Sequence, residues 1–142
     1  MQLIVESWKD APKVSELYEK MCLNEKSKVY FNRKIQLELK LCETNGGILN
    51  LKNYFINSFH MNLIFQAILS NNDFLKIIKH IDLSSNILDD DFSSSFFNSI
   101  EKFTNLKSLN ISNNQFTIKS LIYFSTATKH MDKMNRKLVI LS

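Results

Sequence analysis

Residues 78–88 read Ile78-Lys79-His80-Ile81-Asp82-Leu83-Ser84-Ser85-Asn86-Ile87-Leu88, and this stretch decides the fold because its pattern occurs twice in the chain. Residues 106–116 carry the same pattern, apolar-x-x-apolar-x-apolar-x-x-Asn-x-apolar, with the asparagine at the same place. The alignment sets Leu83 against Ile111, a step of 28 residues. Two copies in register indicate an internal repeat, and a period of this size is typical of stacked repeat proteins.

The repeated pattern is that of a leucine-rich repeat. Two weaker copies flank the strong pair: residues 49–56 place Tyr54 where the asparagine should stand, and residues 139–142 begin a fourth copy. Helical patterns separate the copies. The residues expected on the buried faces of those helices are Phe59, Leu63, Ile64, Ala67, Ile68, Phe92, Phe96, Phe97, Ile100, Leu121, Ile122 and Phe124. We therefore expect an α/β fold, a leucine-rich-repeat solenoid of the ribonuclease-inhibitor-like class, with a short parallel sheet on the concave side and helices on the convex side.

Each position of the repeat has an expected physical role. Ile81 and Leu83 should point from a short strand into the core, and neighbouring strands stack about 4.8 Å apart. One apolar column is expected to contain Leu51, Leu83, Ile111 and Leu141. Asn86 and Asn114 stand where the chain leaves the strand, so their amides can pair with backbone groups that would otherwise be buried without a partner. We interpret both asparagines as structural residues.

Side chains that alternate with the core residues should face outward on the concave side. Repeat solenoids bind partners with that extended surface, so we expect partner contacts there. The candidate partner-binding residues are Asn50, Lys52, His80, Asp82, Ser84, Ser108, Asn110 and Ser112. Leu138 and Ile140 should make the far end of this surface apolar, which marks either a binding hot spot or an end that lacks its next repeat.

The first 44 residues lack the repeat pattern and should cover the apolar flank of the first repeat. Residues 10–23 predict a helix with Pro12 in its first turn, where the missing N–H costs nothing. Residues 35–41 alternate between apolar and polar side chains, as in a strand. The expected division is the end of a preceding domain in 1–8, a helical cap in 9–44, and about three repeats plus the start of a fourth in 45–142.

The sequence contains no catalytic or metal-binding motif, and we expect neither enzyme activity nor a cofactor. The three histidines His60, His80 and His130 are scattered, and neither Cys22 nor Cys42 belongs to a C-x-x-C pair. Two cysteines are too few for a disulfide scaffold and suit a reducing compartment. The acidic run in residues 89–91 follows the repeat's asparagine turn, where acidic side chains favour the N-terminus of the next helix.

The net charge of +4 is a mild excess. The main basic cluster contains Lys129, His130, Lys133, Arg136 and Lys137. We interpret it as a solvated helix end rather than a phosphate contact, because Asp132 interrupts it and no aromatic platform accompanies it. Direct nucleic-acid binding is therefore not expected. We also find no signal peptide and no stretch that predicts a membrane span.

A more specific resemblance lies in Val5-Glu6-Ser7-Trp8, Pro12 and the spacing Tyr18-x-x-x-Cys22, followed by Ile81-Asp82-Leu83-Ser84-Ser85-Asn86. These segments resemble the C-terminal region of Tonsoku-like DNA repair proteins. In that family a ubiquitin-like domain ends in a strand, and a Ser-Trp, a helix with Tyr-x-x-x-Cys and leucine-rich repeats follow. The resemblance covers nearly the whole chain, although much of it is repeat consensus. It implies that residues 1–8 end a ubiquitin-like domain and that the chain is a fragment.

The resemblance implies a function as well as a fold. It points to a nuclear scaffold for homologous-recombination repair at stalled or damaged replication forks. Such a scaffold binds a large replication-fork repair protein through its repeats. The family's histone reading depends on segments that this sequence lacks, so it is not implied here. The alternative is a generic intracellular leucine-rich-repeat adaptor with no DNA-related role.

Overall fold

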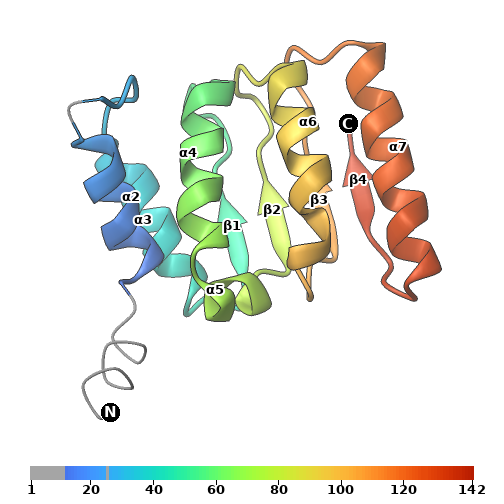
Figure 1. Cartoon of the computed structure of the whole chain (residues 1–142), viewed down its shortest axis with the longest axis horizontal. Helices are drawn as coiled ribbons and strands as arrows, with labels where there is room; N and C mark the ends of the chain where they lie inside the picture. The colour runs from blue at the N-terminus through green and yellow to red at the C-terminus, as the bar shows by residue number, and fades with distance from the viewer. Residues whose placement is uncertain (1–11, 25) are drawn as a thin grey trace.

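The computed structural model describes residues 12–24 and 26–142. Within these residues helices and short strands alternate along the chain (Figure 1). The elements are α2 Val14–Cys22, α3 Arg33–Cys42, β1 Ile48–Asn50, α4 Ser58–Leu69, α5 Asn72–Ile77, β2 His80–Asp82, α6 Asp90–Ser99, the 3-10 helix η1 Ile100–Lys102, β3 Ser108–Asn110, α7 Ile118–Lys133 and β4 Val139–Leu141.

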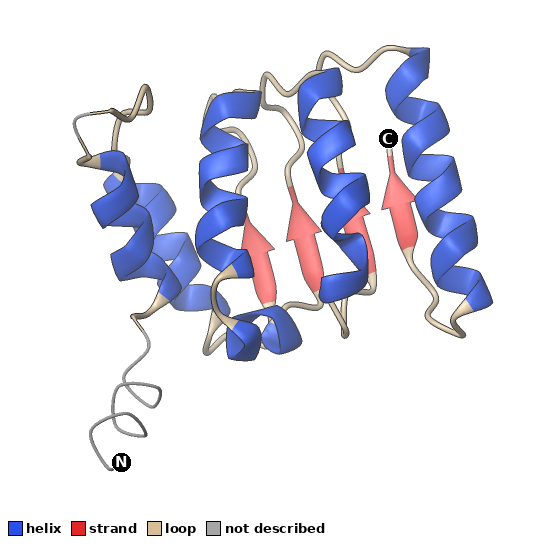
Figure 2. Cartoon of the chain, in the orientation of Figure 1, coloured by secondary structure: helices blue, strands red, loops and turns tan. Residues whose placement is uncertain are grey.

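The strands form one parallel sheet in the order β1-β2-β3-β4. The residues that lie opposite one another at the centre of the strands are Leu49, Ile81, Leu109 and Ile140. Helices α4, α6 and α7 lie together on one side of this sheet (Figure 2). We call the opposite side the uncovered face. The expected α/β fold with a short parallel sheet is therefore confirmed.

The core lies between the sheet and its helices. The central residues of β1, β2 and β3 are buried, and so are Leu51, Leu83 and Ile111 just after these strands. Phenylalanine rings fill the space under the helices, with ring centroids 5.5 Å apart for Phe65 and Phe92. Burial of such large side chains supplies most of the favourable free energy of folding.

Asn86 holds the turn that follows β2. Its side-chain amide donates to the carbonyl oxygens of Leu51 and Leu83 at 2.9 and 3.0 Å. Its Oδ1 accepts the backbone N–H groups of Tyr54 and Ile56, both at 3.0 Å. The corresponding bonds of Asn114 join it to Leu83, Leu88, Ile111 and Ser112. These bonds satisfy backbone groups of two successive turns at once, which explains the asparagine in the repeated pattern.

Residues 35–41 belong to helix α3, so the strand-like interpretation of their alternation is wrong. The side chain of Asn32 accepts the N–H groups of Lys34 and Ile35 and thereby caps the helix. Ile35 and Leu39, four residues apart, are buried on one helix face, whereas the alternating Leu37 is exposed. A pattern in which every second residue is apolar also places apolar residues four apart, so it fits a helix as well as a strand. The Asn32 cap stabilises the helical conformation here.

Two smaller expectations about helices are also wrong. Helix α2 begins at Val14, so Pro12 precedes the helix rather than standing in its first turn. Phe59, Leu121 and Ile122 are exposed instead of buried. For the two α7 residues the reason is their place in the fold, since α7 and β4 lie at the end of the array with no further described element beside them (Figure 1).

The interpretation of residues 1–8 as the end of a ubiquitin-like domain lies outside the described residues. The same holds for Val5-Glu6-Ser7-Trp8, the first part of the family resemblance. The spacing of Tyr18 and Cys22 does fall within the described helix α2, where both side chains are buried.

Candidate partner-binding surface

The uncovered face of the sheet carries two rows of side chains. One row is formed by Ile48, His80, Ser108 and Val139, and the other by Asn50, Asp82, Asn110 and Leu141. Within the first row, His80 Nδ1 and Ser108 Oγ are 2.7 Å apart and hydrogen-bonded. Most of the residues expected on a polar strip therefore lie together on one surface, in the order in which the strands pair.

The second row also terminates the strands. Asn50 Oδ1 accepts the backbone N–H of Lys52 at 3.2 Å. Asp82 Oδ1 accepts the N–H and the hydroxyl of Ser84, at 3.0 and 2.6 Å. Asn110 binds Ser112 in the same way, at 3.1 and 2.5 Å. Such Asx turns direct the chain away from the sheet. The signal in the sequence is an Asp or Asn two residues before a serine, a pattern present in both strong repeats.

Ser84 does not belong to the exposed strip. Its side chain is only 4% exposed, because its hydroxyl is turned back onto Asp82. Ser112, in the equivalent place one repeat later, is half-buried and makes the same bond. A partner could therefore contact Asp82 and Asn110 but not the hydroxyl of Ser84.

The apolar end of the uncovered face consists of other residues than expected. Val139 and Leu141 are 46% and 52% exposed, whereas Leu138 is buried and Ile140 packs against the core. The expected alignment of Leu141 with Ile111 is wrong, since Leu141 lies opposite Asn110. The expected column assumed a step of 30 residues, from Ile111 to Leu141, whereas the observed pairing of Asn110 with Leu141 is a step of 31. A shift of one residue exchanges the two faces of a strand. Ile48, at the other end of the face, is exposed as well.

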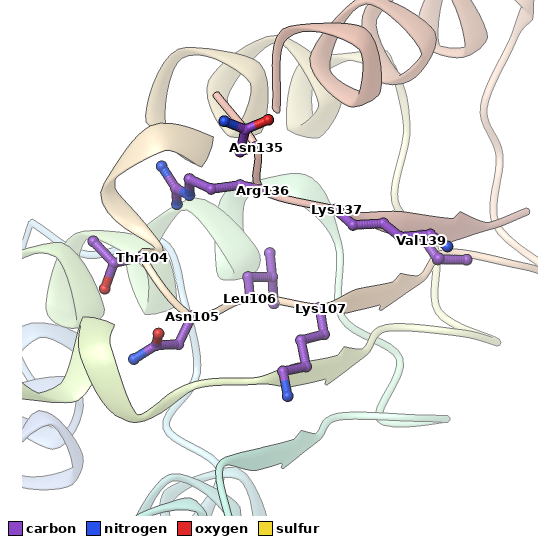
Figure 3. Close-up of a pocket in the computed structure, with 8 residues that line it drawn as sticks. All are labelled: Thr104, Asn105, Leu106, Lys107, Asn135, Arg136, Lys137 and Val139. Carbon is purple, nitrogen blue, oxygen red and sulfur yellow. The ribbon is translucent and has the colours of Figure 1, made fainter. Parts of the chain in front are cut away.

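A basic groove of about 490 Å³ lies beside the starts of β3 and β4 (Figure 3). Lys107, Arg136 and Lys137 contribute to its lining. The guanidinium of Arg136 is engaged by the protein itself, because it donates to the carbonyl oxygens of Glu101 and Phe103 at 3.1 and 2.5 Å. Arg136 thus binds backbone carbonyl groups at the C-terminal end of η1. Lys107 and Lys137 are the basic side chains of the groove that could contact a ligand.

Two other polar candidates, His130 and Asp89, contact groups within the protein. His130 contacts the carboxylate of Glu101, and Asp89 caps helix α6 by accepting the N–H of Asp91. Burial raises the pKa of the Cys42 thiol to about 12, which makes it a poor nucleophile.

Within residues 12–24 and 26–142 no group of three histidine, cysteine or acidic side chains could hold a metal ion. None of the helices in that part of the chain combines the length and apolar character needed to cross a membrane.

Comparison with known proteins adds no assignment to this surface. No model of a known protein family matches the chain, and a search of curated proteins finds no significant relative.

Proposed function

We propose that this chain is a protein–protein interaction module built as a leucine-rich-repeat solenoid of the ribonuclease-inhibitor-like class. The observation that carries the proposal is the uncovered face of the parallel sheet, which has a polar centre and exposed apolar side chains at both ends. Repeat solenoids bind partners with such an extended face, and exposed apolar side chains on it are candidate contact points. Val139 and Leu141 are the apolar anchors, and Asp82 and Asn110 are their polar neighbours.

Two features support the assignment to leucine-rich repeats. The sheet order follows the chain order, as expected when each repeat stacks on the one before it. The asparagines Asn86 and Asn114 make equivalent bonds at equivalent places, each joining its own turn to a neighbouring one.

We further propose that the module belongs to a nuclear scaffold of the Tonsoku-like type, which supports homologous-recombination repair at replication forks. Its partner would be a large replication-fork repair protein, bound through the uncovered face without a cofactor, a membrane or direct contact with nucleic acid. This finer proposal depends on the residues that resemble the family, including Tyr18 and Cys22. The generic intracellular adaptor is the alternative.

Affinity capture combined with surface variants tests two proposals: that the uncovered face binds a protein partner, and that this partner is a replication-fork repair protein. The tagged chain is expressed in cells, and proteins retained by it are compared with those retained by the double variant Val139→Arg with Leu141→Arg. Ile118→Arg is the matched control, because Ile118 is exposed but lies on α7. We expect the double variant to lose partners that the control keeps. Replication and recombination proteins among those partners support the fork-repair scaffold, and signalling or cytoskeletal proteins in their place support the adaptor. Equal retention by both variants excludes the uncovered face.

A further inference from the structure

The N-terminal helices and the first repeat enclose a pocket of about 280 Å³ that the proposed function does not use. Its lining residues come from the loop between α2 and α3, the loop that follows β1, and the start of α4. Figure 1 shows that the α2–α3 loop and the start of α4 lie at the same end of their helices. Its lining residues are Lys28, Val29, Tyr30, Phe31, Asn32, Tyr54, Phe55, Asn57 and His60. We call it the aromatic pocket.

Aromatic side chains around this pocket are exposed to an unusual degree. Tyr30 is 93% exposed and Phe55 is 79% exposed. Folding gains nothing from leaving such rings in water, and grouped exposed apolar side chains mark interaction sites. Phe55 also has a φ angle of +55°, in the left-handed region that bulky residues rarely adopt. Such backbone strain tends to occur at functional sites.

The floor of the aromatic pocket is held in place by a chain of hydrogen bonds. The backbone N–H of Asn32 donates to the Tyr18 hydroxyl oxygen at 3.2 Å. The Tyr18 hydroxyl and His60 Nε2 are 2.8 Å apart and hydrogen-bonded. Burial lowers the pKa of His60 to about 4, which keeps the imidazole neutral and able to accept. These bonds tie the loop to α4, and the pocket is therefore preformed.

The segment that borders the aromatic pocket is basic, and one acidic residue, Glu38, contacts the pocket residue Tyr54. From Lys26 to Leu37 the chain has four basic residues and no acidic one. Lys28 lines the pocket itself. Asn32 and Asn57 use their Oδ1 atoms to cap α3 and α4, and within the described residues neither Nδ2 group has a hydrogen-bond partner. The pocket thus offers a cation and amide donors beside exposed rings.

We propose that the aromatic pocket docks an acidic segment of a partner protein, which inserts one apolar side chain between Tyr30 and Phe55. The basic residues attract the acidic segment, and the amides of Asn32 and Asn57 donate to its carbonyl or carboxylate oxygens. A peptide fits better than single-stranded nucleic acid, because the exposed rings flank one small pocket, whereas single strands bind by stacking successive bases on several aromatic side chains along a basic groove. This contact is separate from the uncovered face.

Direct binding to a defined peptide tests the proposal. The probe is a fluorescein-labelled peptide of aspartates and glutamates around one central phenylalanine, and its binding to the full chain is followed by fluorescence anisotropy. We expect Tyr30→Ala with Phe55→Ala to weaken binding about tenfold. Lys28→Glu should also weaken it, and added salt should do the same. Ile118→Ala is the control, because Ile118 is an apolar side chain on α7 that is 75% exposed.

Several outcomes would overturn the proposal. One is the absence of measurable binding by the acidic peptide, and another is unchanged binding by the Tyr30/Phe55 variant. A peptide with asparagine and glutamine in place of the acidic residues must bind more weakly, or charge plays no part. An oligothymidine that binds at the pocket more tightly than the peptide would assign it to nucleic acid instead. Thermal melts of each variant verify that it is folded. Since these variants leave Val139 and Leu141 intact, failure here leaves the proposal for the uncovered face standing.

Discussion

The side chain of Asn86 forms hydrogen bonds with five backbone groups. Its amide donates to three carbonyl oxygens, and its Oδ1 accepts two backbone N–H groups. A buried polar group without a partner costs about 1–3 kcal/mol, which makes this residue hard to replace.

Replacing Asn86 by alanine should destabilise the protein by about 2–4 kcal/mol, since several buried backbone groups lose their partner together. Urea unfolding followed by circular dichroism measures the change. Asn98→Ala is the control, because Asn98 is exposed on α6, and its cost should stay within about 0.5 kcal/mol. Equal midpoints for the two variants would contradict the role assigned to Asn86.

His60 should make stability depend on pH. Its pKa is lowered from 6.5 to about 4 in the folded protein by burial, so the unfolded chain binds the proton more readily. The contribution of neutral His60 is fully present above pH 6.5 and is lost progressively as the pH falls to about 4. The melting temperature should therefore fall in this range.

The variant His60→Gln tests this dependence, because glutamine can still form a hydrogen bond with Tyr18 but does not titrate. We expect the variant to lose less stability than the native chain over the same fall in pH, as measured by thermal melts. His80 and His130 remain in both proteins and serve as an internal control. Parallel pH profiles would show that His60 does not titrate in this way.

At the scale of elements, the entry into β1 depends on a close contact between two turns. The carbonyl oxygen of Gly47 accepts the N–H groups of Lys79 and His80, at 2.8 and 3.1 Å. A Cβ atom on Gly47 would lie 2.1 Å from the carbonyl oxygen of Ile77, and the φ angle of Gly47 is +82°. Only glycine fits both conditions.

Gly47→Ala should cost about 3 kcal/mol or more, because the backbone at the start of β1 or β2 must move. Gly46→Ala is a matched control: Gly46 has a φ of +86°, but a Cβ atom there would meet nothing within 4 Å. Its cost should be about 1 kcal/mol from backbone conformation alone. Chemical denaturation distinguishes the two, and a larger loss for Gly46→Ala would contradict the close-contact argument.

At the scale of the whole molecule, the array of strands ends in an open edge. β4 pairs with β3 on one side, and no described strand pairs with its other side. Leu121 on α7 and Leu141 on β4 are exposed at this end, beside a shallow pocket that reaches Ile111 and Phe124. An exposed edge strand with apolar neighbours favours pairing with another chain.

We therefore expect the chain of 142 residues to self-associate as its concentration rises. Sedimentation velocity measures this, and Leu121→Lys with Leu141→Lys should shift the distribution toward monomer, because charged residues protect edge strands. Tyr30→Lys, at the opposite end of the array, is the control and should leave association unchanged. A native chain that remains monomeric at all concentrations would refute the prediction.

Much of the fold could be predicted from short sequence patterns. The repeated stretch correctly identified the buried positions Ile81 and Leu83 and the turn asparagines, because these roles depend on neighbours within a few residues. The alternation in residues 35–41 was ambiguous, since it contains both strand and helix spacings, and the Asn32 cap decides between them. Local patterns are reliable where a single period dominates.

The candidate surfaces depended more on the tertiary structure. The sequence by itself determined the parallel strands of the two strong repeats and hence the polar centre of the uncovered face. Only the folded chain decided that Val139 and Leu141, rather than Leu138 and Ile140, face outward, because the length of the α7 connection sets the register of β4. The aromatic pocket likewise combines residues 28–32 with residues between 54 and 60. A periodic pattern in the sequence describes neighbouring residues and does not predict which distant loops come together.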